Sequence, residues 1–402
     1  MLQERPMVRT DSELAALCAE LREAGRFAID TEFIGERSYV PRFCLAMVAT
    51  PAFITLIDPL PIRNLDPLWG LLADAAVEKV LHAAREDLRL AYYGGKGAVP
   101  ARIWDTQVAA GLIGFSPYPP GYGRLVQSML GVRLDKSETR SDWDRRPLSP
   151  EQIRYARDDV RYLLPLADRL RALLEEEGRV DWAEEEMGKF TEASLYEPDP
   201  EEAYLRVRSP RRGMNGQATA VLQALAAWRE RTAADQDVPV RSILSDDLLT
   251  ALSLRPPRRV HDLSRVRGFP EGDENTLGPP IMKAITAAQA VAEADLPPAL
   301  AEGPDERTPE ERAIADMIYS LATALCASQK ISPELALGRA EAAALARGDR
   351  NLPVLKGWRR TALGENLCRF VEGAATAQVR VEGKSVGVSF GEVSMCDAPH
   401  SE

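Results

Sequence analysis

The chain has 402 residues, of which 45% are apolar and 28% are charged, and its net charge of −11 at pH 7 disfavours a nonspecific nucleic-acid binder. No apolar run approaches the 18 or more residues of a membrane span, and the first residues lack the apolar core of a signal peptide, so we expect neither a membrane partner nor secretion. Five scattered Cys without a C-x-x-C pair and only three His exclude a disulfide framework, a zinc site and His-rich metal sites, and they favour a reducing cytoplasm.

Shifts in composition divide the chain into an N-terminal section that mixes strands and helices, two helical sections, and a tail that we expect to be weakly ordered. Two linkers rich in proline and charge separate them. The predicted boundaries are 1–195, 211–292, 309–378 and 379–402 for the sections, and 196–210 and 296–308 for the linkers.

The N-terminal section opens with a helical pattern at 11–24 that ends before Gly25. Three apolar runs follow, FAIDTEF, FCLAMVAT and AFITLID, and they predict a β-meander. EKVLHA predicts a further strand, which leads into a helix over AREDLRLAYY, and helical patterns dominate from there to Gly188. This order predicts an α/β or α+β domain.

The strand FAIDTEF carries two acids, Asp30 and Glu32, inside an apolar run. Residues two apart in a strand share a face, so the two carboxylates repel each other and resist burial. Three explanations are open at this point: an edge strand with both acids in water, pairing of each acid with an Arg, or a divalent cation bound by both carboxylates.

Two later elements carry further acids. Asp87 falls at the start of a predicted helix, where the helix dipole alone would favour an acid. In LSPEQIRYARDDVRYLLPL, Ser149 can cap a helix, with Pro150 in the first turn and Gln152 completing a capping box.

Tyr155 and Asp159 are four residues apart on that helix and share a face, whereas Asp158 lies about 100° round and is expected to face solvent or an Arg. Pro165 is expected to kink the helix.

With its three motifs IDTEF, HAAREDL and YARDD, the chain resembles the DEDD superfamily of 3′→5′ exonucleases, in the tyrosine-bearing branch. The stretch YGRLVQSMLGVRLDKSETRSDWDRRPLSPEQIRYARDDVRYLLPL resembles the ribonuclease D family within that branch. The section 211–292 resembles an HRDC domain, and 309–378 resembles a more divergent second copy. The resemblance implies an RNase H-like α/β exonuclease domain with a mixed sheet, followed by two all-α bundles.

The resemblance also implies a site in which Asp30, Glu32, Asp87 and Asp159 bind two divalent cations, Mg²⁺ or Mn²⁺. One cation would lie with Asp30, Glu32 and Asp159 on the side of the attacking water, and the other with Asp30 and Asp87. Tyr155 would orient the water, because a phenol with an ordinary pKa near 10 is a poor base at neutral pH.

Other residues near the motifs have less specific signals. His82 ends an apolar strand, and a structural role is preferred to metal binding, since an all-oxygen site suits Mg²⁺. The candidates for substrate contact in LDKSETRSDW are Lys136, Ser137, Arg140 and Trp143, with a braced loop and a packed Trp as the alternative.

Two basic runs lie in or before the helical sections, at 206–212 and at 255–267, and the second contains Arg258 and Arg259. Each run is either a phosphate footprint or a solvated loop.

The resulting hypothesis is a monomeric, metal-dependent 3′→5′ exoribonuclease that trims the 3′ ends of tRNA precursors and other small structured RNAs and releases nucleoside 5′-monophosphates. A DNA 3′→5′ exonuclease and a catalytically inactive RNA-binding relative remain as alternatives. The first is weakened because no P-loop of a helicase is present, and the second because all five motif residues are intact.

Overall fold

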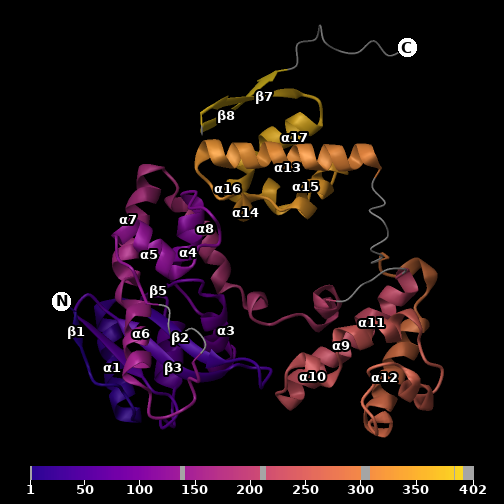
Figure 1. Ribbon diagram of the computed structural model, residues 1–402, viewed down its shortest axis with the longest axis horizontal. Helices are drawn as coiled ribbons and strands as arrows, with labels where there is room; N and C mark the ends of the chain where they lie inside the picture. The colour runs from indigo at the N-terminus through magenta and orange to yellow at the C-terminus, as the bar shows by residue number, and fades with distance from the viewer. Residues whose placement is uncertain (1, 136–140, 209–213, 300–307, 384, 393–402) are drawn as a thin grey trace. The chain divides into compact units, whose positions relative to one another are not determined.

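Figure 1 shows the computed structural model of the protein, which describes residues 2–135, 141–208, 214–299, 308–383 and 385–392. The chain divides into two units, each described by itself below. The sheet unit comprises Met1–Glu32, Cys44–Glu192 and Arg307–Glu402, and the helical unit comprises Phe33–Phe43 and Ala193–Glu306. None of the helices in the described ranges is long and apolar enough to cross a membrane.

The sheet unit contains a six-stranded mixed sheet with the strand order β1-β4-β3-β2-β5-β6. β4 pairs parallel with β1 and antiparallel with β3, and β5 pairs parallel with both β2 and β6. The strands are β1 Gln3–Glu4, β2 Arg26–Ile34, β3 Arg42–Ala49, β4 Phe53–Ile57, β5 Glu78–Leu81 and β6 Ile103–Asp105. The predicted mixed sheet and meander are confirmed. Because β2 lies between β3 and β5, the edge-strand explanation for its two acids is wrong.

Eight helices accompany this sheet in the described residues up to 188. They are α1 Asp11–Ala24, α2 Asp66–Leu72, α3 Arg85–Gly94, α4 Thr106–Leu112, α5 Tyr122–Leu130, α6 Pro150–Arg161, α7 Leu163–Glu176 and α8 Val180–Gly188. The first begins at a Thr10 capping box and ends at Gly25, whose φ of 68° lies in the left-handed region that a glycine adopts easily.

The helix that was expected to kink at Pro165 is instead two helices, because α6 ends at Arg161 and α7 begins at Leu163. Pro165 has no N–H to donate to the carbonyl of Arg161, four residues earlier, and its ring crowds that carbonyl. The chain therefore turns at Tyr162, which has non-helical backbone angles.

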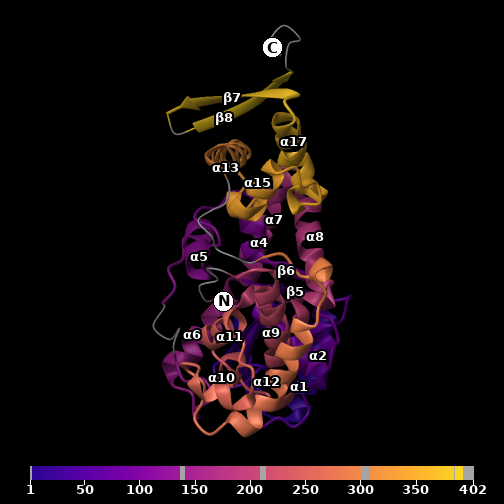
Figure 2. The same ribbon diagram turned by 90° about the vertical axis from the view of Figure 1, so that its right-hand side faces the viewer.

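The last section of the sheet unit is helical up to Val371 and then forms a hairpin. Its elements are α13 Pro309–Gln329, α14 Pro333–Ala336, α15 Arg339–Ala346, α16 Gly357–Arg359, a π-helical turn Arg360–Gly364, α17 Glu365–Val371, β7 Ala375–Glu382 and β8 Ser385–Glu392. β7 and β8 pair antiparallel, and β8 packs against α13 while β7 packs against α17 (Figure 2).

The prediction of a weakly ordered tail is therefore wrong up to Glu392, and residues 393–402 lie outside the described part. Burial contributes little to β7, since Val381 is 70% exposed. Pairing of the two strands and packing against α13 stabilise the hairpin, and neither contact is visible in a local pattern.

Buried polar contacts fasten this last section to the helices that follow the sheet. Arg179 donates to the carbonyls of Leu112 (2.7 Å), Lys330 (2.9 Å) and Gln329. The Glu186 carboxylate accepts from the Arg359 guanidinium and from the Trp358 indole N–H (2.8 Å). The section is thus a fixed part of the sheet unit.

The helical unit has its own apolar core, built around a long central helix. Its elements are α9 Gly216–Gln236, α10 Val240–Ile243, α11 Asp246–Leu254 and α12 Glu274–Gln289, with 3₁₀ helices at Pro200–Arg206, Val260–Arg265 and Glu293–Asp295. The expected linker 196–210 contributes buried Ala203 and Val207 to this core, so it is not a simple spacer.

Segment Phe33–Phe43 also belongs to the helical unit, which the sequence did not indicate. The Tyr39 hydroxyl donates to Glu230 (2.9 Å), and the backbone N–H groups of Tyr39 and Val40 both donate to Asp237 (3.1 Å). These bonds tie the segment that follows β2 to α9.

The buried Glu186–Arg359 pair generates a stability prediction. Arg359→Ala leaves a carboxylate that is 7% exposed with Lys189 as its remaining cation, so we expect the free energy of unfolding to fall by about 3–5 kcal/mol. The neighbouring Arg360 pairs with Glu365 in solvent, and Arg360→Ala should cost less than about 1 kcal/mol. Urea titration of both variants measures this difference in the free energy of unfolding. Equal losses would contradict the stabilising role assigned to the Glu186–Arg359 pair.

Candidate active site

Three carboxylates from β2 and α6 meet beside the centre of the sheet. Asp30 and Glu32 lie two residues apart on β2, and Asp159 lies on α6. One oxygen of each lies within 4.8 Å of one oxygen of each of the others. This is the spacing at which three oxygens can share a cation, and hard cations such as Mg²⁺ take oxygen ligands.

Asp87 joins this group from the first turn of α3. Its Oδ1 accepts a hydrogen bond from the backbone N–H of Thr31 (3.1 Å) and another from the Thr31 hydroxyl. Thr31 lies between Asp30 and Glu32, so the same three-residue segment carries two acids and holds a third. The sequence reasoning missed Thr31, and a hydroxyl residue between two acids is the signal that could have drawn attention to it.

Helix α6 presents Asp159 and Tyr155 together, as their spacing predicts. Its start is fixed by the capping box, in which the Gln152 N–H donates to Ser149 Oγ (3.1 Å) and the Ser149 N–H donates to Gln152 Oε1 (2.9 Å). The Tyr155 hydroxyl donates a hydrogen bond to the Asp159 carboxylate, which offsets part of the larger rise in the pKa of Asp159 that burial causes. Asp158 points elsewhere and accepts from Arg161 (2.8 Å), as expected.

The four acids all resist ionisation. Burial, followed by the charges of Asp87, Asp159 and Glu32, raises the pKa of Asp30 well above its ordinary value. Burial also raises the pKa of Glu32 to about 8, with the charges of Asp159 and Asp87 adding to it. Burial is likewise the largest cause that raises the pKa values of Asp87 and Asp159 to about 7.

Within the described ranges, no Lys or Arg forms an ion pair with any of these four acids, so the explanation by Arg pairing finds no support there. A partly buried group of carboxylates without a cationic side chain is a poor arrangement for stability alone. Its all-oxygen donor set fits divalent metal ions, and the carboxylates of Asp30, Glu32, Asp87 and Asp159 are the residues that would hold them.

Other predicted residues lie outside this group. The His82 ring lies between Thr106 Oγ1 (2.9 Å) and the Pro120 carbonyl (3.0 Å), which is the structural role that was preferred. Trp143 is 3% exposed and its ring centroid lies 6.1 Å from that of Tyr155, so it packs beside the site. Lys136, Ser137 and Arg140 lie outside the described residues.

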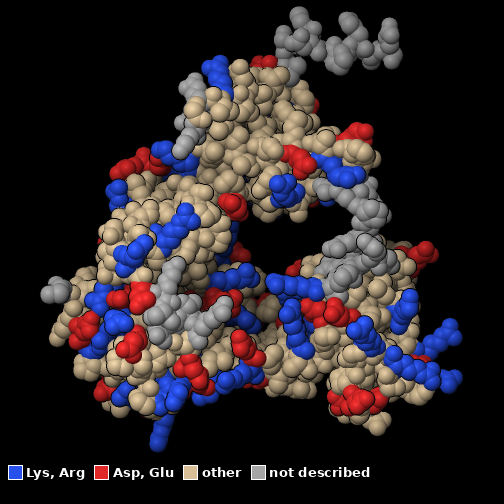
Figure 3. All heavy atoms as spheres, viewed as in Figure 1, with Lys and Arg blue, Asp and Glu red and all other residues tan. Residues whose placement is uncertain are grey.

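Arg258 and Arg259 are exposed in the helical unit, between α11 and the 3₁₀ helix that follows it. The other three Arg of the run 255–267 are exposed as well. Figure 3 shows Lys and Arg side chains projecting from the surface of this unit.

Tyr122 is a second residue that the sequence reasoning missed. Its hydroxyl donates to the Asp158 carbonyl and accepts from the Tyr162 N–H, both at 3.3 Å, so it braces the end of α6 next to Asp159. Burial and the charges of Asp159 and Asp30 raise the pKa of Tyr122 well above its ordinary value. Nothing in its local sequence marks this contact, because Tyr122 begins a different helix.

The family comparisons agree with this site. Residues 6–175 match the family model of a 3′-5′ exonuclease, and residues 218–285 match that of the HRDC domain. The fold and the site therefore define a 3′→5′ exonuclease that carries an HRDC domain. A second HRDC copy at 309–378 stays a prediction.

Relatives and a solved structure specify the family. Ribonuclease D of Gluconacetobacter diazotrophicus is 36% identical over 370 residues, which cover 91% of this chain and 93% of the relative. Ribonuclease D of Acidiphilium cryptum is 35% identical over 94% of this chain and 95% of its own. The crystal structure of Escherichia coli RNase D, an exoribonuclease involved in structured RNA processing, matches with a TM-score of 0.78 and 31% identity over 91% of this chain and 98% of that chain.

The chain belongs to the ribonuclease D family. It is accordingly a 3′→5′ exoribonuclease with an RNase H-like α/β domain, as the motifs predicted.

The raised pKa values generate a prediction about pH. In the absence of divalent cations the folded protein keeps protons on Glu32, Asp87 and Asp159 up to about pH 7 to 8, whereas the unfolded chain releases them near pH 4. The free energy of unfolding should therefore fall as the pH rises from about 4 to about 8. One unit of pKa shift corresponds to about 1.4 kcal/mol, so this fall is on the order of several kcal/mol.

Urea titrations in EDTA across this pH range measure the effect, with Asp30→Asn as the comparison. The substitution removes one ionisable group from the site, so the free energy of unfolding should fall less with pH. In the unaltered protein, Mg²⁺ should also reduce this fall. Identical pH profiles for both proteins in EDTA would contradict the conclusion that Asp30 belongs to a group of acids with raised pKa values.

Proposed function

We propose that the protein is a divalent-metal-dependent 3′→5′ exoribonuclease that trims the 3′ ends of tRNA precursors and other small structured RNAs and releases nucleoside 5′-monophosphates. The observation that supports this proposal is the gathering of Asp30, Glu32, Asp87 and Asp159 with raised pKa values and with no cationic side chain paired to them among the described residues. Mg²⁺ is the proposed ion, with Mn²⁺ as its substitute.

The reaction is hydrolysis of the last phosphodiester. Water attacks phosphorus, the bond to the 3′ oxygen of the preceding nucleotide breaks, and the terminal nucleotide leaves with its 5′ phosphate while the shortened RNA gains a 3′ hydroxyl. These carboxylates would hold two divalent ions, which would supply Lewis-acid activation of the water and neutralise charge on the leaving oxygen.

The residues of the chain contribute position. The Tyr155 hydroxyl donates a hydrogen bond to Asp159, so its oxygen can accept a hydrogen bond from a water molecule and hold that water in one orientation. Asp87 is kept in place by Thr31, and Asp159 is kept in place by the braced end of α6. The preference for RNA over DNA is inferred from the family, and incubation of end-labelled RNA beside DNA of the same sequence with Mg²⁺ tests it.

The HRDC domain is proposed to bind the body of the RNA. All five Arg of the run 255–267 are exposed. Arg265 forms an ion pair with Asp262 at 3.8 Å, which is long for such a contact. An Arg run of this kind can contact phosphates without reading base identity. Four of the scattered cysteines are free in the described part, which agrees with a cytoplasmic enzyme. We also propose that the enzyme is a monomer.

The first functional prediction concerns Asp30. Asp30→Asn removes one of the proposed metal ligands and should lower kcat by about 10³-fold or more, on the scale of several kcal/mol of transition-state stabilisation. The fold should survive, since the substitution relieves repulsion in the group. Asp158→Asn is the matched control, because Asp158 pairs with Arg161 outside the group, and it should stay within a few-fold of the unaltered enzyme. Near-normal activity of Asp30→Asn in Mg²⁺ would overturn the site assignment.

The second functional prediction concerns the Arg run. Arg258→Glu and Arg259→Glu should each weaken binding of a tRNA-sized substrate and lower its salt slope by about one. Hydrolysis of a very short oligonucleotide should be unchanged if that substrate does not reach the run.

Lys96→Glu, at an exposed position in the sheet unit, changes the net charge by the same amount and serves as the control. Equal losses for all three variants would mean that total charge, and not the run, governs binding. Equal losses on long and short substrates would mean that the helical unit does not act as an RNA-binding surface.

A further inference from the structure

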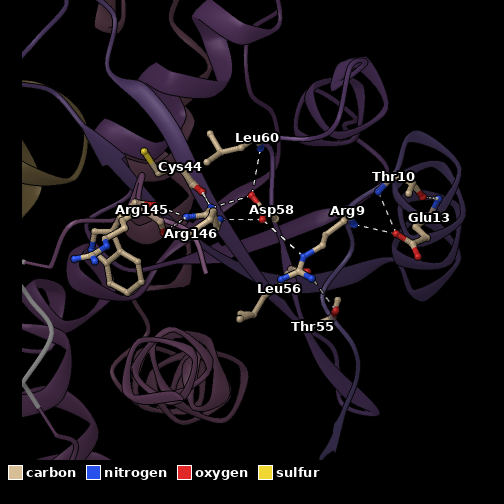
Figure 4. A network of polar contacts seen from close by, with 11 residues as sticks. Arg9, Thr10, Glu13, Cys44, Thr55, Leu56, Asp58, Leu60, Arg145 and Arg146 are labelled. Atoms are coloured by element: carbon tan, nitrogen blue, oxygen red, sulfur yellow. Dashed lines mark hydrogen bonds and ion pairs between the residues drawn. The ribbon is translucent and has the colours of Figure 1, made fainter. Parts of the chain in front are cut away.

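An ion pair next to the active site joins two segments that are 88 residues apart in sequence (Figure 4). The Arg146 guanidinium donates to both oxygens of Asp58, from Nε at 2.9 Å and from Nη2 at 2.8 Å. Asp58 follows β4 directly and is 3% exposed. Arg9 is the second cation near it, at 3.8 Å and half exposed. A two-pronged bond of this kind fixes the plane of the guanidinium as well as its distance.

The remaining donors of Arg146 bind backbone carbonyls. Nη2 donates to the Cys44 carbonyl on β3 (2.7 Å), and Nη1 donates to the carbonyls of Trp143 (2.7 Å) and Arg145 (3.0 Å). All five N–H groups of Arg146 are thus used. The guanidinium therefore fastens the peptide that carries Trp143 to two strands of the sheet.

Trp143 in turn lies against Tyr155. The Trp143 side chain is buried, and the two rings lie 6.1 Å apart between centroids with an angle of 38° between their planes. Gln152, which caps α6, donates weakly to the neighbouring Asp142 carbonyl (3.4 Å). The ring of Tyr155 thus packs against a neighbour whose backbone is held by Arg146, while its hydroxyl is held by Asp159.

The need for such support follows from the role of Tyr155. A residue that acts only by orienting water contributes through the position of its oxygen, and a displacement of about 1 Å can cost about 10²-fold in rate. The hydrogen bond to Asp159 restrains the oxygen at one end. The ring must be restrained separately, since rotation about its side-chain bonds would move the oxygen.

We propose that the Asp58–Arg146 pair is a positioning device for hydrolysis, which acts through Trp143 to hold the ring of Tyr155 in its productive orientation. This inference rests on the proposed function of Tyr155. A buried ion pair is weak evidence for a purely stabilising role, because well-packed apolar residues often stabilise a fold as well or better. The forked geometry of this pair, in contrast, fixes orientation.

A double-mutant cycle between the ion pair and Tyr155 tests the proposal. Four proteins are assayed as the full chain on an end-labelled single-stranded RNA with Mg²⁺: the unaltered protein, Arg146→Lys, Tyr155→Phe and the double variant. Lysine keeps the charge but cannot make the forked bond. Tyr155→Phe should lower kcat by about 10²-fold. Arg146→Lys should lower kcat by about 10-fold and leave the KM for RNA within about twofold. In the Tyr155→Phe background the same substitution should lower kcat by less than about twofold, because the effects of residues that act as a unit are not additive.

Unfolding midpoints of the same four proteins separate positioning from stability. Any loss of stability from Arg146→Lys should be the same in both backgrounds, whereas the loss of kcat should appear only when the hydroxyl is present. Arg22→Lys, at the Arg22–Asp74 pair of the same unit, is the matched control and should leave kcat unchanged in both backgrounds. Asp58→Asn and Trp143→Phe provide the same cycle from the other two members, should Arg146→Lys fold poorly.

The outcomes distinguish this inference from the proposed function. If Tyr155→Phe lowers kcat and Arg146→Lys lowers it by an equal further factor in both backgrounds, the pair is structural and the positioning inference is wrong while the function stands. An unchanged kcat in Arg146→Lys also overturns the inference. If Tyr155→Phe has no effect while Asp30→Asn is inactive, the role proposed for Tyr155 is wrong, and the inference fails with it.

Discussion

The gathering of four partly buried carboxylates is the constraint on which the arrangement of this enzyme depends. Asp30 and Glu32 lie on a strand inside the sheet, and Asp87 and Asp159 are brought to it from α3 and α6. Burial raises the pKa values of all four acids, and for Asp30 and Glu32 the charges of the neighbouring acids add to that rise. A fold selected for stability alone would separate these groups or pair them with Arg. Their gathering is instead explained by the cations they would bind, so the site lowers stability for the sake of function.

The two helical sections differ in physical character although their sequences contain similar patterns. The section from α13 to α17 is fastened to the sheet unit through the buried Glu186–Arg359 pair and through Arg179, so its contacts are those of a domain interior. The section from α9 to α12 closes its own core and exposes an Arg run on a loop. The second property suits a surface that meets a polyanion. The first suits a support for α4 and α8.

Local signals predicted much of the fold and of the site. Short apolar runs predicted β2, β3 and β4, the capping box predicted the start of α6, and the four-residue spacing placed Tyr155 beside Asp159. What could not be predicted depends on contacts between distant segments. The hairpin after Ala375 depends on α13, the brace from Tyr122 crosses from α5 to α6, and segment 33–43 joins α9 through Tyr39. No periodicity in the sequence records such contacts, because each partner looks ordinary in its own segment.

Tyr155 is the point at which local and distant information meet. A phenol is a poor base at neutral pH, so the contribution proposed for Tyr155 depends on where its oxygen is held. One restraint, from Asp159, comes from the same helix and is visible in the motif Y-x-x-x-D. The other comes from the ring of Trp143, whose backbone is held by Arg146, which is held in turn by Asp58 at the end of β4. On this proposal the motif specifies which groups take part in the chemistry, while the sheet, through an ion pair outside the motif, specifies the orientation of one of them.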